Sequence, residues 1–251
     1  MDDVLKRAID LREQRKNIQK SHDKLIRDLR VYYTGLPTKA LYPYDYQYSE
    51  IFLNILRNKA LMCPLYHHLY IQVEKTVEEC LKRSIPIENW YVYGIASIDY
   101  DDYMKRLDKA KDEIVLETII TGLKDIADID SLDQSIINST IDEIRKTGLD
   151  TELTHLTTEN QNIKAVVTYF SRSMEEGNPI YLTVNEKSSG RFGRKQIGTA
   201  EKEQLYFWIS KLTLNTTSVK IKAKGPSDRA DWHLKDKPRS MEFSIEEILN
   251  G

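Results

Sequence analysis

The chain has 251 residues, and its 37 Lys and Arg against 39 Asp and Glu leave a net charge of −2 with His neutral. This balance favours neither nucleic acid nor a membrane surface as a partner. No stretch approaches the roughly 18 consecutive apolar residues of a transmembrane helix, and the opening residues do not resemble a signal peptide. Cys63 and Cys80 suit free thiols in a reducing compartment. We therefore predict a cytoplasmic protein with no membrane partner.

The first part of the chain is predicted to be helical. A long amphipathic helix is expected over residues 1–34, because residues 2–33 contain no Gly or Pro and apolar or aromatic side chains recur every seven positions. Gly35 and Pro37 would end it. The recurring positions are Val4, Leu11, Ile18, Leu25 and Tyr32. A second helix is expected over residues 49–61, with Ser49 as its N-cap.

Between these two predicted helices lies a row of tyrosines. They alternate with other residues at Tyr42, Tyr44, Tyr46 and Tyr48. In an extended segment this spacing would place all four rings on one side. Such a row could be an interaction surface, or it could pack against the helices.

The middle of the chain is predicted to alternate between strands and helices. The expected order is strand 66–73, helix 75–83, strand 88–98, helix 112–129 and helix 132–146. Ser131 and Gln134 form the pattern of a capping box before the last helix. The helix over 112–129 places its apolar residues on one face and Glu113, Glu117 and Asp128 on the other.

After Gly148 the pattern changes to short strands. They are expected at residues 153–157, 163–170, 180–184, 204–212 and 219–224, followed by a final helical turn capped by Ser244 and Glu247. We therefore predict an α+β fold in which a helical N-terminal half packs on a mostly antiparallel C-terminal sheet. One continuous unit over residues 1–251 is expected. The alternative is a helical portion, 1–148, and a β-rich portion, 149–251.

The sequence contains none of the common catalytic or nucleotide-binding motifs, so we predict no catalytic residue, metal site or cofactor. His67 and His68 lie in a strand-like run, where neighbouring side chains point to opposite faces and cannot readily share a metal. Asp231 and His233, beside Trp232, could act as an acid and a base. An enzyme with no recognised motif centred on this pair is kept as an alternative.

Two segments concentrate charge of one sign. Residues 99–143 hold thirteen acidic and five basic residues, a net −8, which is typical either of a solvated face or of a surface for a basic partner. The second segment is a glycine-containing basic hairpin formed by Lys187, Arg191, Phe192, Arg194 and Lys195. It could contact phosphates as a nucleic-acid-binding module, or it could be a solvated hairpin tip.

A family resemblance covers about residues 66–155. It is carried by Trp90-Tyr91-Val92-Tyr93, by Ile98-Asp99-Tyr100-Asp101-Asp102-Tyr103, by the helix from Leu116 to Leu123, by Ile141-Asp142-Glu143-Ile144 and by Thr147-Gly148-Leu149-Asp150-Thr151-Glu152-Leu153. This pattern resembles uncharacterised bacterial immunity-type proteins of polymorphic and contact-dependent toxin systems. The resemblance implies a small cytosolic α+β protein, not an enzyme, that protects its cell by binding a cognate toxin.

The resemblance has no invariant motif, so the expected toxin-binding residues come from charge and aromatic content. We expect the partner to contact Glu113, Glu117 and Asp128, with Tyr44 and Tyr46 as aromatic anchors. The oligomeric state stays open.

Overall fold

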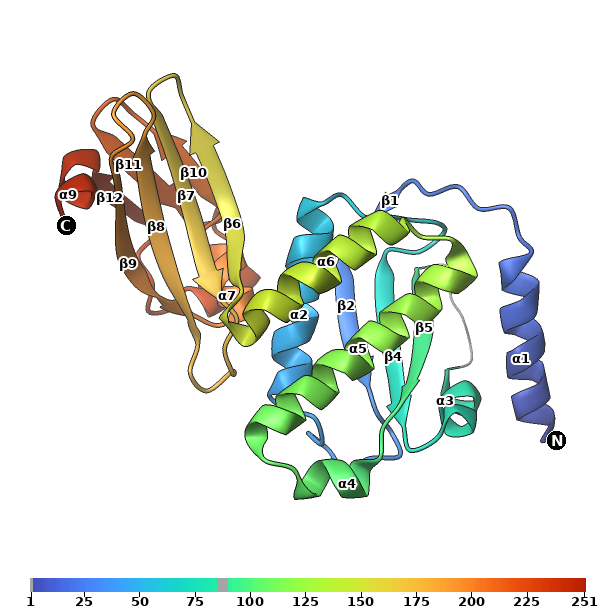
Figure 1. The fold of residues 1–251 in the computed structure, drawn as a ribbon. Helices are drawn as coiled ribbons and strands as arrows, with labels where there is room; N and C mark the ends of the chain where they lie inside the picture. The colour runs from blue at the N-terminus through green and yellow to red at the C-terminus, as the bar shows by residue number, and fades with distance from the viewer. Residues whose placement is uncertain (1, 85–89) are drawn as a thin grey trace. The chain divides into compact units, whose positions relative to one another are not determined.

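The chain folds into two units, Met1–Leu149 (unit 1) and Asp150–Gly251 (unit 2), in a computed structural model that describes residues 2–84 and 90–251 (Figure 1). The α+β fold class is confirmed, since both units combine helices and strands. We expected one continuous unit, with a division at 148/149 as the alternative; the two units divide at 149/150.

Unit 1 is built on a three-stranded parallel sheet in the order β2-β4-β5, which the sequence pattern does not predict. The strands are β2 (Asp28–Tyr32), β4 (His68–Glu74) and β5 (Tyr91–Ser97). Helices α2 (Tyr44–Asn58), α5 (Asp108–Asp130) and α6 (Gln134–Thr147) lie together on one side of it (Figure 1). The predicted middle strands and helices are thus observed, but they make a sheet and its cover within one unit.

Smaller elements complete unit 1. These are α1 (Asp3–Lys16), β1 (Lys24–Leu25), β3 (Met62–Cys63), α3 (Val77–Arg83), α4 (Tyr100–Lys105) and the 3-10 turn Gly148–Asp150, which runs across the unit boundary. The first two residues of the predicted strand 88–98, residues 88 and 89, lie outside the described residues.

The helical layer approaches the sheet closely where two glycines meet. A Cβ atom on Gly94 of β5 would lie 2.0 Å from the carbonyl oxygen of Gly122 in α5. A Cβ on Gly122 would lie 2.3 Å from the Ile71 side chain. Because Leu69 and Ile71 are fully buried beneath this contact, each contributes on the order of 1.5–3 kcal/mol of hydrophobic stabilisation.

The prediction of one helix over residues 1–34 is wrong. Helix α1 ends at Lys16, and residues 24–25 and 28–32 are strands. Parallel pairing of β2 with β4 buries Leu29, and the chain before it buries Ile26, so tertiary pairing overrides the helical spacing. The sevenfold stripe is not a packing face, because Val4 and Ile18 are 49% and 56% exposed.

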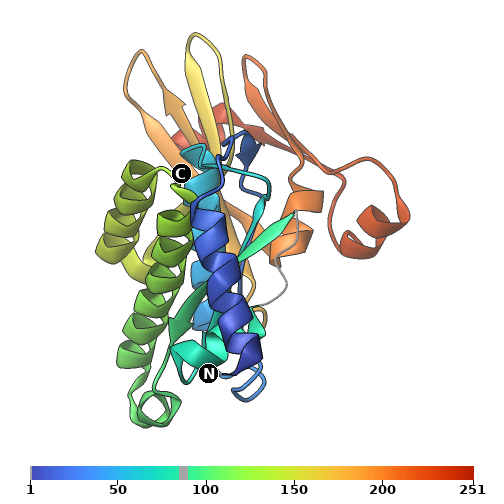
Figure 2. The same cartoon turned by 90° about the vertical axis from the view of Figure 1, so that its right-hand side faces the viewer.

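Charged side chains fix α1 in place where apolar contacts are few. Helix α1 lies beside α5 (Figure 2) and buries only Ala8. Arg12 binds the Asp125 carboxylate, which also accepts a 2.9 Å hydrogen bond from the Ile95 backbone N–H. Arg15 binds the fully buried Asp130 of α5. The short α1 helix is therefore attached mainly by ion pairs.

From Tyr44 onward the tyrosine row is helical and not extended, and Tyr42 lies in the turn before the helix. Helix α2 begins at Tyr44, five residues before the predicted start, and its N-cap position is Pro43 instead of Ser49. Residues four apart share a helix face, so Tyr44 and Tyr48 lie together and Tyr46 lies on another face. Tyr48 is buried and donates a hydrogen bond to Asp112.

The boundary between α5 and α6 also differs from the predicted capping box. Ser131 ends α5 in a left-handed conformation with φ of 54°. Asp133 is the N-cap of α6, and its carboxylate accepts hydrogen bonds from the backbone N–H groups of Ser135 at 2.9 Å and Ile136 at 3.2 Å. An aspartate at this position satisfies two N–H groups that the helix leaves unpaired.

Unit 2 contains two antiparallel sheets, as predicted for the C-terminal part. The first has the order β6 (Glu152–Glu159), β7 (Ile163–Phe170), β8 (Asn178–Glu186) and β9 (Phe192–Ala200). The second has the order β10 (Lys211–Leu214), β11 (Ser218–Lys222) and β12 (Ser240–Ser244). Alternate residues of β7 and β8 are fully buried: Ala165, Val167, Tyr169, Ile180, Leu182 and Val184.

Three short helices accompany these sheets: α7 (Lys202–Trp208), α8 (Asp228–His233) and α9 (Ile245–Asn250). The predicted strand 204–212 is therefore wrong over its first half. Its buried residues Leu205, Trp208 and Ile209 follow helical spacing. The final helical turn is confirmed, because the Ser244 side chain accepts from the Glu247 backbone N–H at 3.4 Å.

Candidate partner-binding site

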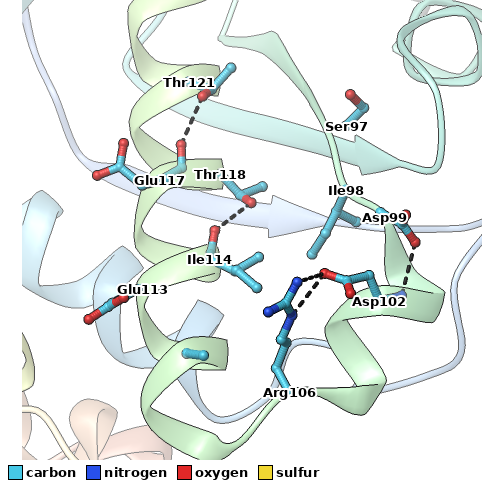
Figure 3. Close-up of a pocket in the computed structure, with 11 residues that line it drawn as sticks. Ser97, Ile98, Asp99, Asp102, Arg106, Glu113, Ile114, Glu117, Thr118 and Thr121 are labelled. Carbon is cyan, nitrogen blue, oxygen red and sulfur yellow. Dashed lines mark hydrogen bonds and ion pairs between the residues drawn. The ribbon is translucent and has the colours of Figure 1, made fainter.

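An open cavity of about 580 Å³ lies beside the carboxyl end of β5, between α4 and α5 (Figure 3). In open sheets of parallel strands, ligands bind at the carboxyl ends of the strands. We call this cavity the acidic pocket. It is lined by Ser97, Ile98, Asp99, Asp102, Arg106, Ala110, Glu113, Ile114, Glu117, Thr118 and Thr121. Its four carboxylates and one guanidinium give the lining a formal charge of −3.

Helix capping shapes the α4 wall of the acidic pocket. The Asp99 carboxylate accepts a 2.9 Å hydrogen bond from the Asp102 backbone N–H and so starts α4. The Arg106 guanidinium donates to the Asp102 carboxylate at 2.9 and 2.7 Å (Figure 3). The one cation of the lining is thus already offset by a carboxylate one helical turn away.

The α5 wall presents carboxylates to solvent. The hydroxyls of Thr118 and Thr121 donate to the carbonyl oxygens of Ile114 and Glu117, at 2.7 and 2.8 Å, and are therefore occupied within the helix (Figure 3). The Glu117 carboxylate forms a 2.8 Å ion pair with Arg145 of α6, and both groups are about half exposed. Glu113 is exposed and has no ion-pair partner among residues 2–84 and 90–251.

The structure brings together two of the five residues expected to contact a partner. Glu113 and Glu117 line the acidic pocket. Asp128 lies eleven residues beyond Glu117 in α5, which is roughly 16 Å from Glu117 along the helix axis. The Asp128 carboxylate accepts a 3.2 Å hydrogen bond from Gln134. Tyr44 and Tyr46 of α2 are not among the lining residues. Desolvation raises the pKa of Tyr44, and Asp108 and Asp112 add to this effect.

Asp99, Asp102 and Arg106 line the pocket but are not among the residues expected from the sequence to contact a partner. Asp99 followed by Asp101 and Asp102 is the pattern of a helix N-terminus, with an N-cap and acidic residues in the first turn, and this local pattern predicts α4. The pocket itself depends on how α4 packs beside α5. No local pattern predicts that arrangement.

The basic hairpin does not present its cations as one surface. Three of them form ion pairs within unit 2: Lys187 with Glu159 at 2.9 Å, Arg191 with Glu246 at 3.2 Å and Arg194 with Glu152 at 3.0 Å.

The side chains of the basic hairpin also point in different directions. Arg194 lies 4.1 Å from the centroid of the Tyr181 ring, whereas the Lys195 ammonium lies 5.7 Å from the centroid of Phe243. Phe192 is 68% exposed. Neighbouring positions of β9 thus face opposite sides of the strand.

Asp231 and His233 contact different partners. The Asp231 carboxylate binds Arg239, while the His233 ring stacks on Phe207 with centroids 4.7 Å apart. The His233 Nε2 atom lies 3.2 Å from Glu203. The two groups are thus held by different partners, and no hydrogen bond or ion pair among the described residues joins them as an acid and a base.

His67 and His68 were expected to point to opposite faces, and this is wrong. Their Nδ1 atoms are in contact and their ring centroids lie 4.3 Å apart, because His67 precedes β4 and strand alternation does not apply to it. Desolvation lowers the pKa of both rings. Within the described part of the chain, no group of three or more His, Cys, Asp or Glu side chains is placed to hold a metal ion.

Both cysteines are buried and free. Burial raises the pKa of the Cys63 thiol to about 12 and that of the Cys80 thiol to about 11. The thiols are therefore protonated near neutral pH and are poor nucleophiles.

Comparison with family models, with curated proteins and with solved structures gives no match for this chain. Among the helices of the described ranges, none combines the length and apolar character needed to cross a bilayer. Function must therefore be inferred from the side chains themselves.

Proposed function

We propose that the protein is a non-enzymatic binding protein of the immunity type, which acts in the cytoplasm by binding and neutralising a cognate bacterial toxin. The acidic pocket would receive a basic segment of that toxin. The observation that supports this proposal is the net charge of −3 in an open cavity whose carboxylate Glu113 has no ion-pair partner in the described part of unit 1.

The charge arrangement favours a cationic ligand. Asp99 and Asp102 border the cavity on one wall, and the Glu113 and Glu117 side chains lie on the side of α5 turned away from them (Figure 3). A basic protein surface would therefore meet these glutamates along the outer side of α5. Opposite charges across an interface raise the association rate and exclude wrongly charged partners, even where each exposed pair contributes only about 0.2–1 kcal/mol. A basic protein surface is thus the partner that this pocket fits best.

The form of the pocket favours a protein over a small molecule. Small-molecule sites enclose most of their ligand with apolar and aromatic side chains. Five of the eleven described lining residues are charged, and none of the eleven is aromatic. It can take one or two side chains from a larger surface, while contacts around the rim supply the rest of the binding free energy.

The test starts with a photo-crosslinking amino acid at Ala110, inside the pocket, in the cell that makes the protein. The captured protein is identified and purified, and its affinity for the full chain is measured by calorimetry. We expect Glu113→Lys with Glu117→Lys to weaken binding at least tenfold, because the α5 wall would then repel a basic segment.

The matched control is Asp128→Lys with Asp142→Lys, which makes the same charge change on exposed positions of α5 and α6 outside the pocket. It should weaken binding by less than about threefold. Equal losses in the two double variants would show that net charge matters and the pocket does not. A captured toxin whose activity is unaffected by the protein would contradict neutralisation.

A further inference from the structure

The second face of the unit 1 sheet carries aromatic and basic side chains instead of aliphatic ones. Strand register places Arg30, Tyr70 and Tyr93 in one row across β2, β4 and β5. Asp28, His68 and Tyr91 form the next row. Alternate residues such as Leu69, Ile71 and Gly94 point to the other face, where α5 packs (Figure 1). We call the set Arg30, Tyr32, His68, Tyr70, Trp90, Tyr91 and Tyr93 the aromatic face.

The rings of the aromatic face form one connected group. Tyr70 is its buried centre, stacked on Tyr91 with centroids 5.2 Å apart and met edge-on by Tyr32 at 5.0 Å. Trp90 meets the Tyr91 ring at 4.5 Å. Tyr32, Tyr91 and Tyr93 are half-buried, and Trp90 is 47% exposed.

This exposure is unusual for such a cluster. Rings that only filled a core would be covered, and exposed aromatic groups of this size usually mark an interaction site. The packing among the rings also fixes their orientation, so a ligand that stacks on them loses little side-chain entropy.

The border of the aromatic face is basic. Lys24, Arg27 and Arg30 are exposed around it, and the nearest acid in β2, Asp28, is mostly buried and pairs with Arg30 at 2.6 Å. Desolvation is the main cause of the lowered pKa of His67 and His68; Arg27 makes a smaller contribution in the same direction to both, while Asp28 acts in the opposite direction on the pKa of His68. The face is therefore opposite in sign to the acidic pocket of the same unit.

We propose that the aromatic face binds a single-stranded nucleic acid, with bases stacked on Trp90 and the neighbouring tyrosines and phosphates held by the exposed Lys24 and Arg27. Bases stack on aromatic rings with little dependence on sequence, and cations beside the rings follow the phosphate backbone. A carbohydrate would need free carboxylates or amides for its hydroxyls, and the carboxylate of Asp28 is held by Arg30. This inference is independent of the proposed function, because it uses other residues.

The test is fluorescence anisotropy of a fluorescein-labelled 12-nucleotide single strand, oligo-dT or oligo-rU, titrated with the full chain between 20 and 200 mM NaCl. Contact with two or three phosphates predicts a slope of log affinity against log salt of about −1.4 to −2.1. In a variant with Trp208→Phe and Trp232→Phe, Trp90 is the one remaining tryptophan, and its fluorescence should be quenched on binding.

Two variants locate the site. Trp90→Ala should lower affinity about 5- to 150-fold through lost stacking. Arg27→Glu should lower affinity and reduce the salt slope by about 0.7. The matched controls are Trp232→Ala and Arg229→Glu, an exposed tryptophan and an exposed arginine in α8 of unit 2. They should leave both quantities unchanged.

Several results would overturn the proposal. The first is absence of binding at 20 mM salt. The second is equal affinity for a duplex of the same length, which would indicate phosphate contact without stacking. The third is loss of binding in Lys187→Glu with Arg191→Glu but not in Trp90→Ala, which would move the site to the basic hairpin. Quenching of Trp90 by an oligosaccharide, or by self-association of the chain without nucleic acid, would also contradict it.

Discussion

The acidic helix α5 of unit 1 and the basic hairpin of unit 2 both concentrate one sign of charge in the sequence, but the structure treats them differently. In the hairpin, Lys187, Arg191 and Arg194 each pair with a carboxylate of their own unit. In α5, Asp130 is buried among cations while Glu113 is left open to solvent. The number of like charges in a segment therefore identifies a binding surface only when charges that are paired within the same unit are left out of the count.

The largest stability change that this comparison predicts is for the buried carboxylate of Asp130. Asp130 is fully buried, is bound by Arg15 and by Tyr66, and forms a 2.6 Å ion pair with Lys20. Asp130→Ala would leave two largely buried cations uncompensated, so we expect unit 1 to lose about 3–5 kcal/mol of unfolding free energy. Urea unfolding followed by Trp90 fluorescence, with the other two tryptophans replaced by Phe, measures this unit.

The control for this prediction is Asp128→Ala, two residues away on the exposed side of α5. It should change the unfolding free energy by less than about 0.5 kcal/mol. A loss below about 1 kcal/mol for Asp130→Ala would show that the cluster around this carboxylate does not stabilise the attachment of α1.

How much of the molecule the sequence predicts depends on the range of the forces involved. Helices α5 and α6 and strands β4 and β7 are predictable because their periodicity is strong and local. The segment 24–32 follows helical spacing, but its conformation is decided by pairing of β2 with β4 some forty residues away. Strand β9, rich in polar residues and glycine, is likewise held by β8.

The candidate sites follow the same rule. Glu113 and Glu117 can be found from the polar face of one helix, whereas the opposite wall of the acidic pocket depends on the packing of α4. The aromatic face could not be predicted at all, because Arg30, Tyr70 and Tyr93 become neighbours only through the register of three parallel strands. The sequence shows these residues, but not that they share a row.

A second prediction separates ring packing from ion pairing in the basic hairpin. The Arg194 guanidinium lies over the ring of Tyr181, is 5.9 Å from the ring of Phe170 and pairs with Glu152. Arg194→Met should cost unit 2 about 1–2 kcal/mol, since cation–π and ion-pair contributions are lost together. Thermal unfolding followed by Trp208 and Trp232 in a Trp90→Phe variant measures the effect.

Lys187 provides the comparison, because it pairs with Glu159 and lies over no aromatic ring of the described residues. Lys187→Met should cost no more than about 0.5 kcal/mol. If the two substitutions were equally costly, ion pairs alone would stabilise the hairpin and the ring contacts of Arg194 would add nothing.

A third prediction concerns the pH dependence of unit 2. Desolvation lowers the pKa of His155 in β6, although its Nε2 atom contacts the Ile209 carbonyl oxygen at 2.6 Å. Because the folded pKa lies below the unfolded value of about 6.5, the stabilisation is present above that value and is lost as pH falls below it. Unfolding of unit 2 measured from pH 7.5 to 4.5 should show this loss.

His155→Gln keeps a hydrogen-bond donor but cannot take up the proton. Its stability should change less steeply over the same pH interval, while its stability at pH 7.5 changes little. An unaltered slope would assign the acid sensitivity of unit 2 to carboxylates and not to this ring.

The smallest expected effect bears most directly on the acidic pocket. Glu113 has no ion-pair partner among the residues that the structure describes, so Glu113→Lys should change the stability of unit 1 by less than about 0.5 kcal/mol. Glu117→Lys breaks the exposed pair with Arg145 and should cost about 0.2–1 kcal/mol. Urea unfolding of both single variants would check these values.

A large loss of unfolding free energy for Glu113→Lys would mean that the Glu113 charge stabilises the fold, and that the exposure of this carboxylate does not indicate a partner. A small loss, together with weakened toxin binding, would show a carboxylate kept for recognition, in contrast to the paired cations of the basic hairpin.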